Sequence, residues 1–350
     1  MATTNLLHPL TLLALATVLL AGCAQLGPRA LSEGRPLYNV AVQRTEAEQL
    51  LLNIVRQRYS DPVLFLDVTS IASGFSGQAN VGWSSRVFES VTESASAVLG
   101  GSLRENPNIF YAPNTGEKFV RQMLTPLSIE KLALVLQAGW SIERVLLMSG
   151  ESMNKLRNTP QSRVSDAGTP RYRAALVALR ELQRDGELFI GAAPGEEGVL
   201  AITVKAIARE RLAFREACEL LEISCEEGSI RVRAELARQG DGETIALATR
   251  SLFSTLYYLS RSVDVPEQDL RAGLTSGGGA RDAYESFFRV HSSAQAPERA
   301  AVAIHYRDSW FYISDDDIDS KVTFALLSML VTLQSGDSAT LAPLLALPTR

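Results

Sequence analysis

Cysteine and histidine are scarce in this chain, which has three of each among 350 residues. Three cysteines are too few for a disulfide scaffold or for a four-cysteine zinc site. Basic residues are not in excess, because the formal net charge is −5, and this argues against a dedicated nucleic-acid-binding protein. The rest of the composition, 46% hydrophobic and 21% charged, is typical of a globular protein with one large or two ordinary domains.

Sequence motifs of common catalytic sites are missing as well. No G-x-S-x-G nucleophile motif occurs, and the S-x-x-K pattern at Ser128–Lys131 and Ser152–Lys155 lacks the K-T-G of penicillin-binding sites. The glycines at 277–279 are not followed by the Lys-Ser/Thr of a phosphate-binding loop. We therefore expect no catalytic residues, no cofactor and no enzymatic activity.

Metal ligands are also few. His291 and His305 are the only histidines beyond the first few residues. The acidic run from Asp315 to Asp319 departs from the calcium-loop pattern, since Ser320 replaces its glycine and Leu326 its final glutamate. Carboxylates at this position are better explained as the start of a helix, where they offset unpaired N–H groups. The sequence thus predicts no metal site.

The first 22 residues contain no Asp, Glu, Lys or Arg. The apolar run Leu10–Leu20 is 11 residues long, and a helix of that length, about 16 Å, is too short to cross a membrane. Such a run followed by small residues is typical of a secretory signal. The residues Leu20-Ala21-Gly22-Cys23 resemble the lipobox of bacterial lipoproteins.

This resemblance has several implications for the protein. It implies that the signal peptide, residues 1–22, is removed and that Cys23 carries the acyl chains that anchor the protein to the membrane. Because Ala24 rather than Asp follows the cysteine, it implies a place in the cell outer membrane, with the body facing the periplasm. The mature body itself resembles only bacterial lipoproteins of unassigned role.

Export brings the other two cysteines into an oxidising compartment. Cys218 and Cys225 are seven positions apart, so within one helix they would lie about 10 Å apart, too far to bond. A disulfide therefore requires the helix to end between them, near residues 220–224. A disulfide and two separate buried thiols both remain open alternatives.

The mature chain alternates short strand patterns with short helical patterns, which predicts an α+β fold. We expect a tether at 23–36, an N-terminal α+β region at 37–157, a polar boundary loop at 158–170 and a C-terminal α+β region at 171–350. A capping box at Thr45–Glu48 predicts a helix from there to Tyr59. The apolar stretch 247–260 predicts another helix.

Two charge-rich stretches are interpreted as structural. One is a polar cluster that ties a helix to a sheet, formed by Arg56, Arg58, Tyr59 and Asp61. The other is a solvated helix face that carries Arg209, Arg211 and Arg215 among glutamates.

Residues 63–101 form the most unusual segment. Period-two alternation persists through residues 63–85, with Ile71, Phe75, Ala79, Val81 and Trp83 at one set of positions and polar residues at the other. A second small-residue stretch, 87–101, follows and includes Glu89 and Glu93. Ordinary strands have about five or six residues, so the segment predicts a long protruding hairpin.

Three functions are compatible with these patterns. The leading interpretation is a non-catalytic periplasmic interaction or assembly module of the cell envelope, with envelope proteins as partners and no nucleic acid. In an alternative, the 63–101 hairpin belongs to an oligomeric outer-membrane pore, since it loosely resembles the hairpins from which the curli secretion channel is built. The third interpretation is a periplasmic hydrolase or ligand-binding protein.

Overall fold

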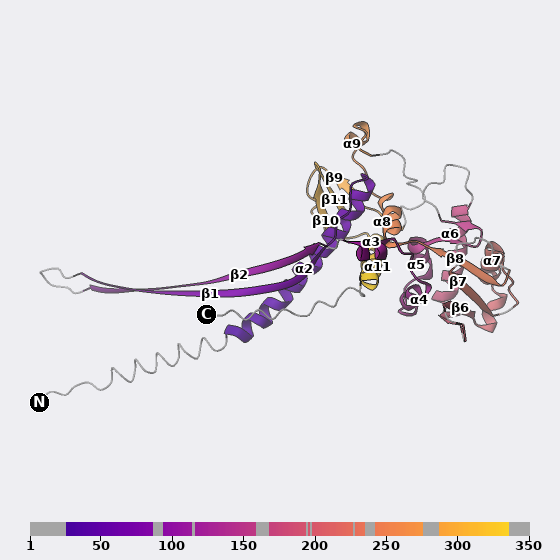
Figure 1. Cartoon of the computed structure of the whole chain (residues 1–350), viewed down its shortest axis with the longest axis horizontal. Coiled ribbons are helices and arrows are strands. Elements are labelled where there is room, and N and C mark those ends of the chain that lie inside the picture. Colours follow the sequence, from indigo (N-terminus) through magenta and orange to yellow (C-terminus); the bar gives the residue numbers. More distant parts are fainter. Residues whose placement is uncertain are drawn as a thin grey trace, which may run out of the picture. The chain divides into compact units, whose positions relative to one another are not determined.

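The computed structural model describes residues 26–86, 94–113, 116–158, 168–193, 195–196, 198–226, 228–234, 242–275 and 287–335 (Figure 1). The fold combines helices with a mixed sheet and two smaller sheets, so the predicted α+β class is confirmed. The chain divides into two compact units. One consists of Met1–Asp61 with Leu259–Ser328, and the other of Pro62–Tyr258 with Met329–Arg350. Most of the predicted boundary loop at 158–170 lies outside the described residues, and its last three residues belong to helix α6 (Gly168–Arg184).

The second unit contains a six-stranded sheet with the strand order β4-β3-β8-β7-β6-β5. Neighbouring strands are antiparallel except for β7 and β8, which are parallel. The strands are β3 (Gly150–Met153), β4 (Leu156–Arg157), β5 (Leu188–Ala192), β6 (Val199–Val204), β7 (Ser229–Ala234) and β8 (Thr244–Thr249). The helices of this unit are α3 (Glu117–Leu124), α4 (Ile129–Gln137), α5 (Ile142–Ser149), α6 (Gly168–Arg184), the 3-10 helix η1 (Ala206–Glu210) and α7 (Leu212–Leu221).

The first unit is built around helix α2 (Leu26–Arg58) and a three-stranded sheet with the order β10-β11-β9. Its strands are β9 (His291–Ser293), β10 (Ala300–Tyr306) and β11 (Ser309–Ser314), and it also contains the short helix α9 (Glu267–Arg271). Leu51, Ile54 and Val55 form the buried face of α2. Two further helices, α8 (Leu252–Ser260) and α11 (Ile318–Ser335), each continue from one unit into the other.

The second unit also contains a long two-stranded ribbon of β1 (Leu66–Arg86) and β2 (Ser94–Pro113) (Figure 1). The strands are antiparallel along their whole length, from Leu66 opposite Pro113 to Arg86 opposite Ser94. The predicted hairpin is therefore present, but its second strand continues to Pro113 rather than ending at residue 101. The first residues of the predicted second arm, 87–93, which include Glu89 and Glu93, lie outside the described residues.

Helix α2 begins earlier than the sequence predicts. It starts at Leu26, so most of the expected tether at 23–36 is helical, and Thr45 lies in its interior rather than at its cap. The Thr45 hydroxyl donates a hydrogen bond to the Val42 carbonyl, 2.9 Å away. A threonine side chain can bind a carbonyl of the preceding turn as readily as it caps a helix, and this ambiguity explains the error.

The predicted helix at 247–260 is wrong in its first part. Residues up to Thr249 belong to strand β8, and α8 begins only at Leu252. The side chains from Thr244 to Leu247 are all buried, so this central strand reads as a continuous apolar run. Periodicity alone does not distinguish such a strand from a buried helix.

Arg250, between β8 and α8, is only 4% exposed. Its guanidinium donates hydrogen bonds to the carbonyl oxygens of Met148 (3.2 Å), Gly150 and Asn158. The same group stacks on the Tyr258 ring at 4.0 Å from the ring centre. One arginine thus satisfies buried carbonyls at the end of α5, in β3 and after β4.

We predict that Arg250→Met strongly destabilises the protein. The methionine fills a similar volume but removes the hydrogen bonds to the buried carbonyls of Met148, Gly150 and Asn158, at a cost of roughly 3 kcal/mol in the free energy of unfolding. Chemical denaturation of the purified body measures this loss. Arg231→Met, at an exposed position on β7, is the matched control and should change stability by at most about 0.5 kcal/mol. Equal effects of the two substitutions would contradict the role of Arg250.

Candidate functional site

The β1–β2 hairpin contains a segment without any charged residue. It extends from the pair Gly77–Leu103 to the pair Ser85–Ala95, which makes nine successive cross-strand pairs. Arg86 follows at one end of the segment, and Arg104 and Glu105 follow at the other. Both strands are uncharged over the same length because the register aligns the two charge-free stretches.

The register also assigns the residues of this segment to two rows. Alternate positions of a strand lie on opposite faces of a sheet, and directly paired positions lie on the same face. The apolar row contains Gly77, Ala79, Val81, Trp83 and Ser85 of β1 with Leu103, Gly101, Leu99, Ala97 and Ala95 of β2. The polar row contains Gln78, Asn80, Gly82 and Ser84 of β1 with Ser102, Gly100, Val98 and Ser96 of β2.

Sequence reasoning found only the β1 half of the apolar row. The stretch 87–101 includes Glu89 and Glu93, which hides the β2 half of this row in the sequence. From Ala95 to Leu103 the odd positions hold only small or apolar residues, while the even positions hold Ser96, Val98, Gly100 and Ser102. The sequence contains this alternation in β2, but it can be recognised only once the pairing register is known.

The dimensions of the segment match the apolar part of a bilayer. Nine residues of an antiparallel strand extend about 30 Å, and a tilt of roughly 40° reduces this to about 23 Å. Membrane-spanning strands have about 9–11 residues and an apolar band about 25 Å tall. In contrast, no helix in the described part of the chain is both long and apolar enough to cross a membrane.

Of the three predicted cysteine positions, Cys23 lies outside the described residues. Cys218 and Cys225 form a disulfide with their Cα atoms 5.9 Å apart. Helix α7 ends at Leu221, and Glu222 adopts a left-handed conformation with a φ of 55°. The helix therefore ends between the two cysteines, as the disulfide alternative requires.

The predicted polar cluster at the end of α2 is confirmed for Tyr59 and Asp61, within the first unit. Asp61 accepts hydrogen bonds from the Tyr306 hydroxyl and from Arg307, the latter at 3.0 Å. Tyr59 donates to Asp269 at 2.5 Å, and the Arg307 guanidinium lies 4.9 Å from the centre of the Tyr59 ring. These contacts fasten the end of α2 to the β10–β11 turn and to α9.

Titration of this cluster follows from its contacts. The hydrogen bond from Tyr306, supported by the one from Arg307, lowers the pKa of the Asp61 carboxyl below its ordinary value. Burial raises the pKa of the Tyr59 phenol, and its hydrogen bond to Asp269 raises it further. Asp61 is thus ionised and Tyr59 neutral at physiological pH, which is the arrangement that the hydrogen bonds require.

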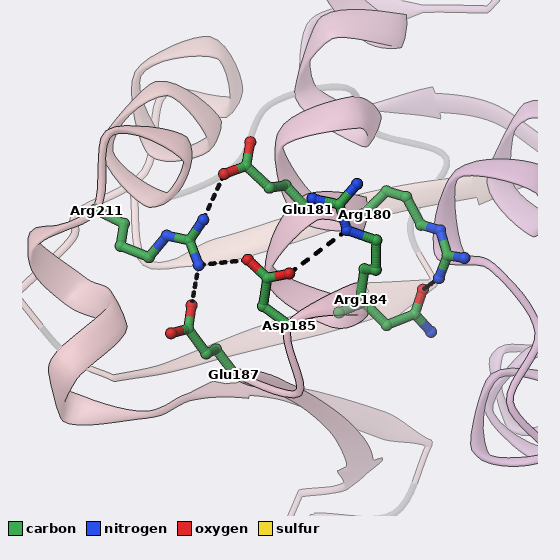
Figure 2. Close-up of polar contacts among 7 residues, drawn as sticks. Arg180, Glu181, Arg184, Asp185, Glu187 and Arg211 are labelled. Carbon is green, nitrogen blue, oxygen red and sulfur yellow. Dashed lines mark hydrogen bonds and ion pairs between the residues drawn. The ribbon is translucent and has the colours of Figure 1, made fainter.

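A second polar cluster centres on Arg211, the residue before α7 (Figure 2). Figure 2 shows its guanidinium between three carboxylates from the end of α6 and the segment that follows it. The ion pairs extend to Glu181 (2.5 Å), Asp185 (2.6 Å) and Glu187 (2.7 Å). The hydrogen bond from Arg211 lowers the pKa of Asp185. The prediction that Arg211 belongs to a solvated helix face is therefore wrong. Its ion pairs link α6 to α7 instead.

Residues with potential catalytic or metal-binding chemistry have structural contacts. His291 Nδ1 lies 3.7 Å from Asp264 Oδ2, which accepts a hydrogen bond from Arg289 at 3.0 Å. Ser128 caps α4 by accepting from the Lys131 amide. In the part of the chain that the structure describes, no group of three or more acidic, histidine or cysteine residues is arranged to hold a metal ion.

The acidic run at 315–319 starts a helix, as predicted. Asp317 Oδ1 accepts from the Ser320 amide at 3.0 Å, and its Oδ2 accepts from the Ser320 hydroxyl at 2.5 Å. Both bonds satisfy donors in the first turn of α11. The glycines at 277–279 lie outside the described residues.

We predict that Asp61→Asn lowers the melting temperature at pH 7 by about 2–4 °C. The lowered pKa means that the ionised Asp61 stabilises the fold at pH values above its unfolded pKa of about 3.9. This contribution disappears as the pH falls through the folded pKa, so wild type and variant should converge in acid. Thermal unfolding between pH 3 and 7 measures the difference. Asp308→Asn, an exposed neighbour, is the control, and a pH-independent difference for Asp61→Asn would contradict the prediction.

Comparisons with known proteins give no guide to function. No protein-family model matches the chain, and neither a curated protein nor a solved structure does. The function is therefore inferred from the residues and the geometry of this chain.

Proposed function

We propose that the protein is an outer-membrane lipoprotein that acts as a non-catalytic assembly module of the cell envelope. Acyl chains on Cys23 anchor it, and its body faces the periplasm. The β1–β2 hairpin is the observation that carries the proposal, because a ribbon of this length and patterning is suited to contact other molecules. The Cys218–Cys225 disulfide supports an exported body, since such bonds persist in oxidising compartments.

The hairpin further favours insertion into the outer membrane over a purely periplasmic contact. Its nine-pair segment combines an uncharged apolar row with a polar row, and charged residues occur only beyond its ends. A periplasmic docking ribbon has no need for this combination, whereas a strand with lipid on one side and water on the other requires it. The proposed module is thus a subunit of an oligomeric outer-membrane pore.

The alternative of a hydrolase or ligand-binding protein has no comparable support. The polar clusters of the described residues, around Asp61, Arg211 and Arg250, hold elements of the fold together. Among those residues, no geometry favours a nucleophile or a cation site over these structural contacts. We carry this alternative no further.

We predict that Cys23→Ser abolishes lipid attachment. The thiol of this residue is the proposed acylation site, so cells that express the variant should incorporate no labelled palmitate into the protein. Ala24→Ser, which leaves the cysteine intact, is the control and should be labelled like wild type. Labelling of the Cys23→Ser protein would refute the anchor.

We predict that single cysteines in the two rows report different surroundings. In lipidated protein reconstituted into liposomes, an environment-sensitive fluorophore on Val81→Cys should show a blue-shifted emission and be quenched by a bromolipid. The same fluorophore on Asn80→Cys should remain accessible to aqueous iodide. Ser254→Cys, at an exposed position on α8, is the aqueous control. Aqueous behaviour at both hairpin positions would refute insertion while leaving a periplasmic assembly role.

A further inference from the structure

The hairpin has two unpaired edges. In the described part of the chain, its sheet consists of β1 and β2 alone, so along the nine-pair segment no neighbouring strand pairs with the backbone N–H and C=O groups on the outer side of each strand. Within a bilayer no water satisfies such groups, and each one costs several kcal/mol. Insertion of a lone hairpin is therefore strongly unfavourable, and further strands must pair with both edges.

The chain itself does not supply these strands among its described residues. The longest of its other strands, β10, has seven residues and already belongs to the three-stranded sheet. Seven residues are also fewer than the nine or more that span the apolar core. A second copy of the chain, in contrast, supplies a strand of matching length and patterning for each edge.

We infer that hairpins of several copies pair head to tail, β1 of one copy with β2 of the next, and close into a ring; this rests on the proposed function. The lipid anchor keeps every copy on the same side of the membrane, so all hairpins enter in the same direction. Each β1 then runs antiparallel to the neighbouring β2, which continues the pairing seen within one hairpin. Pairing of β1 with β1 would leave the β2 edges open. Pairing of β1 with the β2 of the next copy is a heterologous contact, and it closes the ring without free edges.

The register determines which row borders the channel. The apolar row faces lipid, and the polar row lines the water-filled lumen. Arg104 pairs with Ser76, and Arg86 pairs with Ser94. Both pairs lie in the same row as Asn80 and Ser84, the polar row. The polar row therefore carries an arginine at each end of the nine-pair segment, while Glu105 belongs to the opposite row.

Repetition around the ring turns Arg104 and Arg86 into two circles of positive charge, one at each end of the uncharged nine-pair segment. Rings of Arg or Lys select anions. The inferred channel thus conducts small hydrated anions in preference to cations. A sheet of about 16 strands is needed for an aqueous lumen, which corresponds to about eight copies or more at two strands per copy.

The test uses full-length lipidated protein purified in detergent and reconstituted into planar bilayers. Wild type should form rings of uniform mass and show a reversal potential of the sign expected for chloride preference in a KCl gradient. Arg104→Glu should still form rings but shift the reversal potential toward cation preference, because it replaces one of the two positive rings with a negative one. Arg171→Glu, at an exposed position on α6, changes the net charge equally and should behave like wild type. Gly82→Pro, in the middle of β1, should abolish rings without changing the melting temperature of the body.

The outcomes separate the two levels of inference. Conducting rings whose selectivity is unchanged by Arg104→Glu would overturn the assignment of the polar row to the lumen. A fluorophore at position 81 in lipid, together with monomeric and non-conducting protein, would overturn head-to-tail pairing but leave membrane insertion intact. Absence of insertion in the fluorophore experiment would overturn both.

Discussion

The need to pair backbone polar groups outside water governs both the body and the hairpin of this protein. In the body, Arg250 donates hydrogen bonds to carbonyls at the end of α5, in β3 and after β4. Its buried guanidinium also stacks on the Tyr258 ring. The same requirement, unmet at the outer edges of β1 and β2, makes the hairpin dependent on partners.

The polar side chains of the two units are used mainly to join elements. Asp61 connects the end of α2 to the β10–β11 turn, and Arg211 connects the end of α6 to the start of α7. The disulfide fixes the chain just beyond α7. These links account for most of the charged groups that attract attention in the sequence, and they leave the hairpin as the element whose patterning the fold does not use.

Local sequence signals predicted much of the body correctly. The helix start within the acidic run at 315–319 and the alternation in β1 follow from local signals, because a cap and a period of two depend on neighbours in sequence. Prediction failed where tertiary context decides. The sequence predicts a helix at strand β8 because the central position of this strand in the sheet makes it apolar on both faces. It also predicts a helix cap at Thr45, which lies within α2.

The sequence by itself determined the resemblance to a lipoprotein at Cys23, the α+β class, the alternation in β1 and the condition under which Cys218 and Cys225 bond. Only the tertiary structure decided that the helix ends between those cysteines and that β2 continues to Pro113. It also fixed the register that pairs Val81 with Leu99 and sets Arg104 in the polar row. The reason is physical: alternation within one strand is local, whereas a shift of one residue between two strands exchanges their faces, and only long-range pairing selects the register.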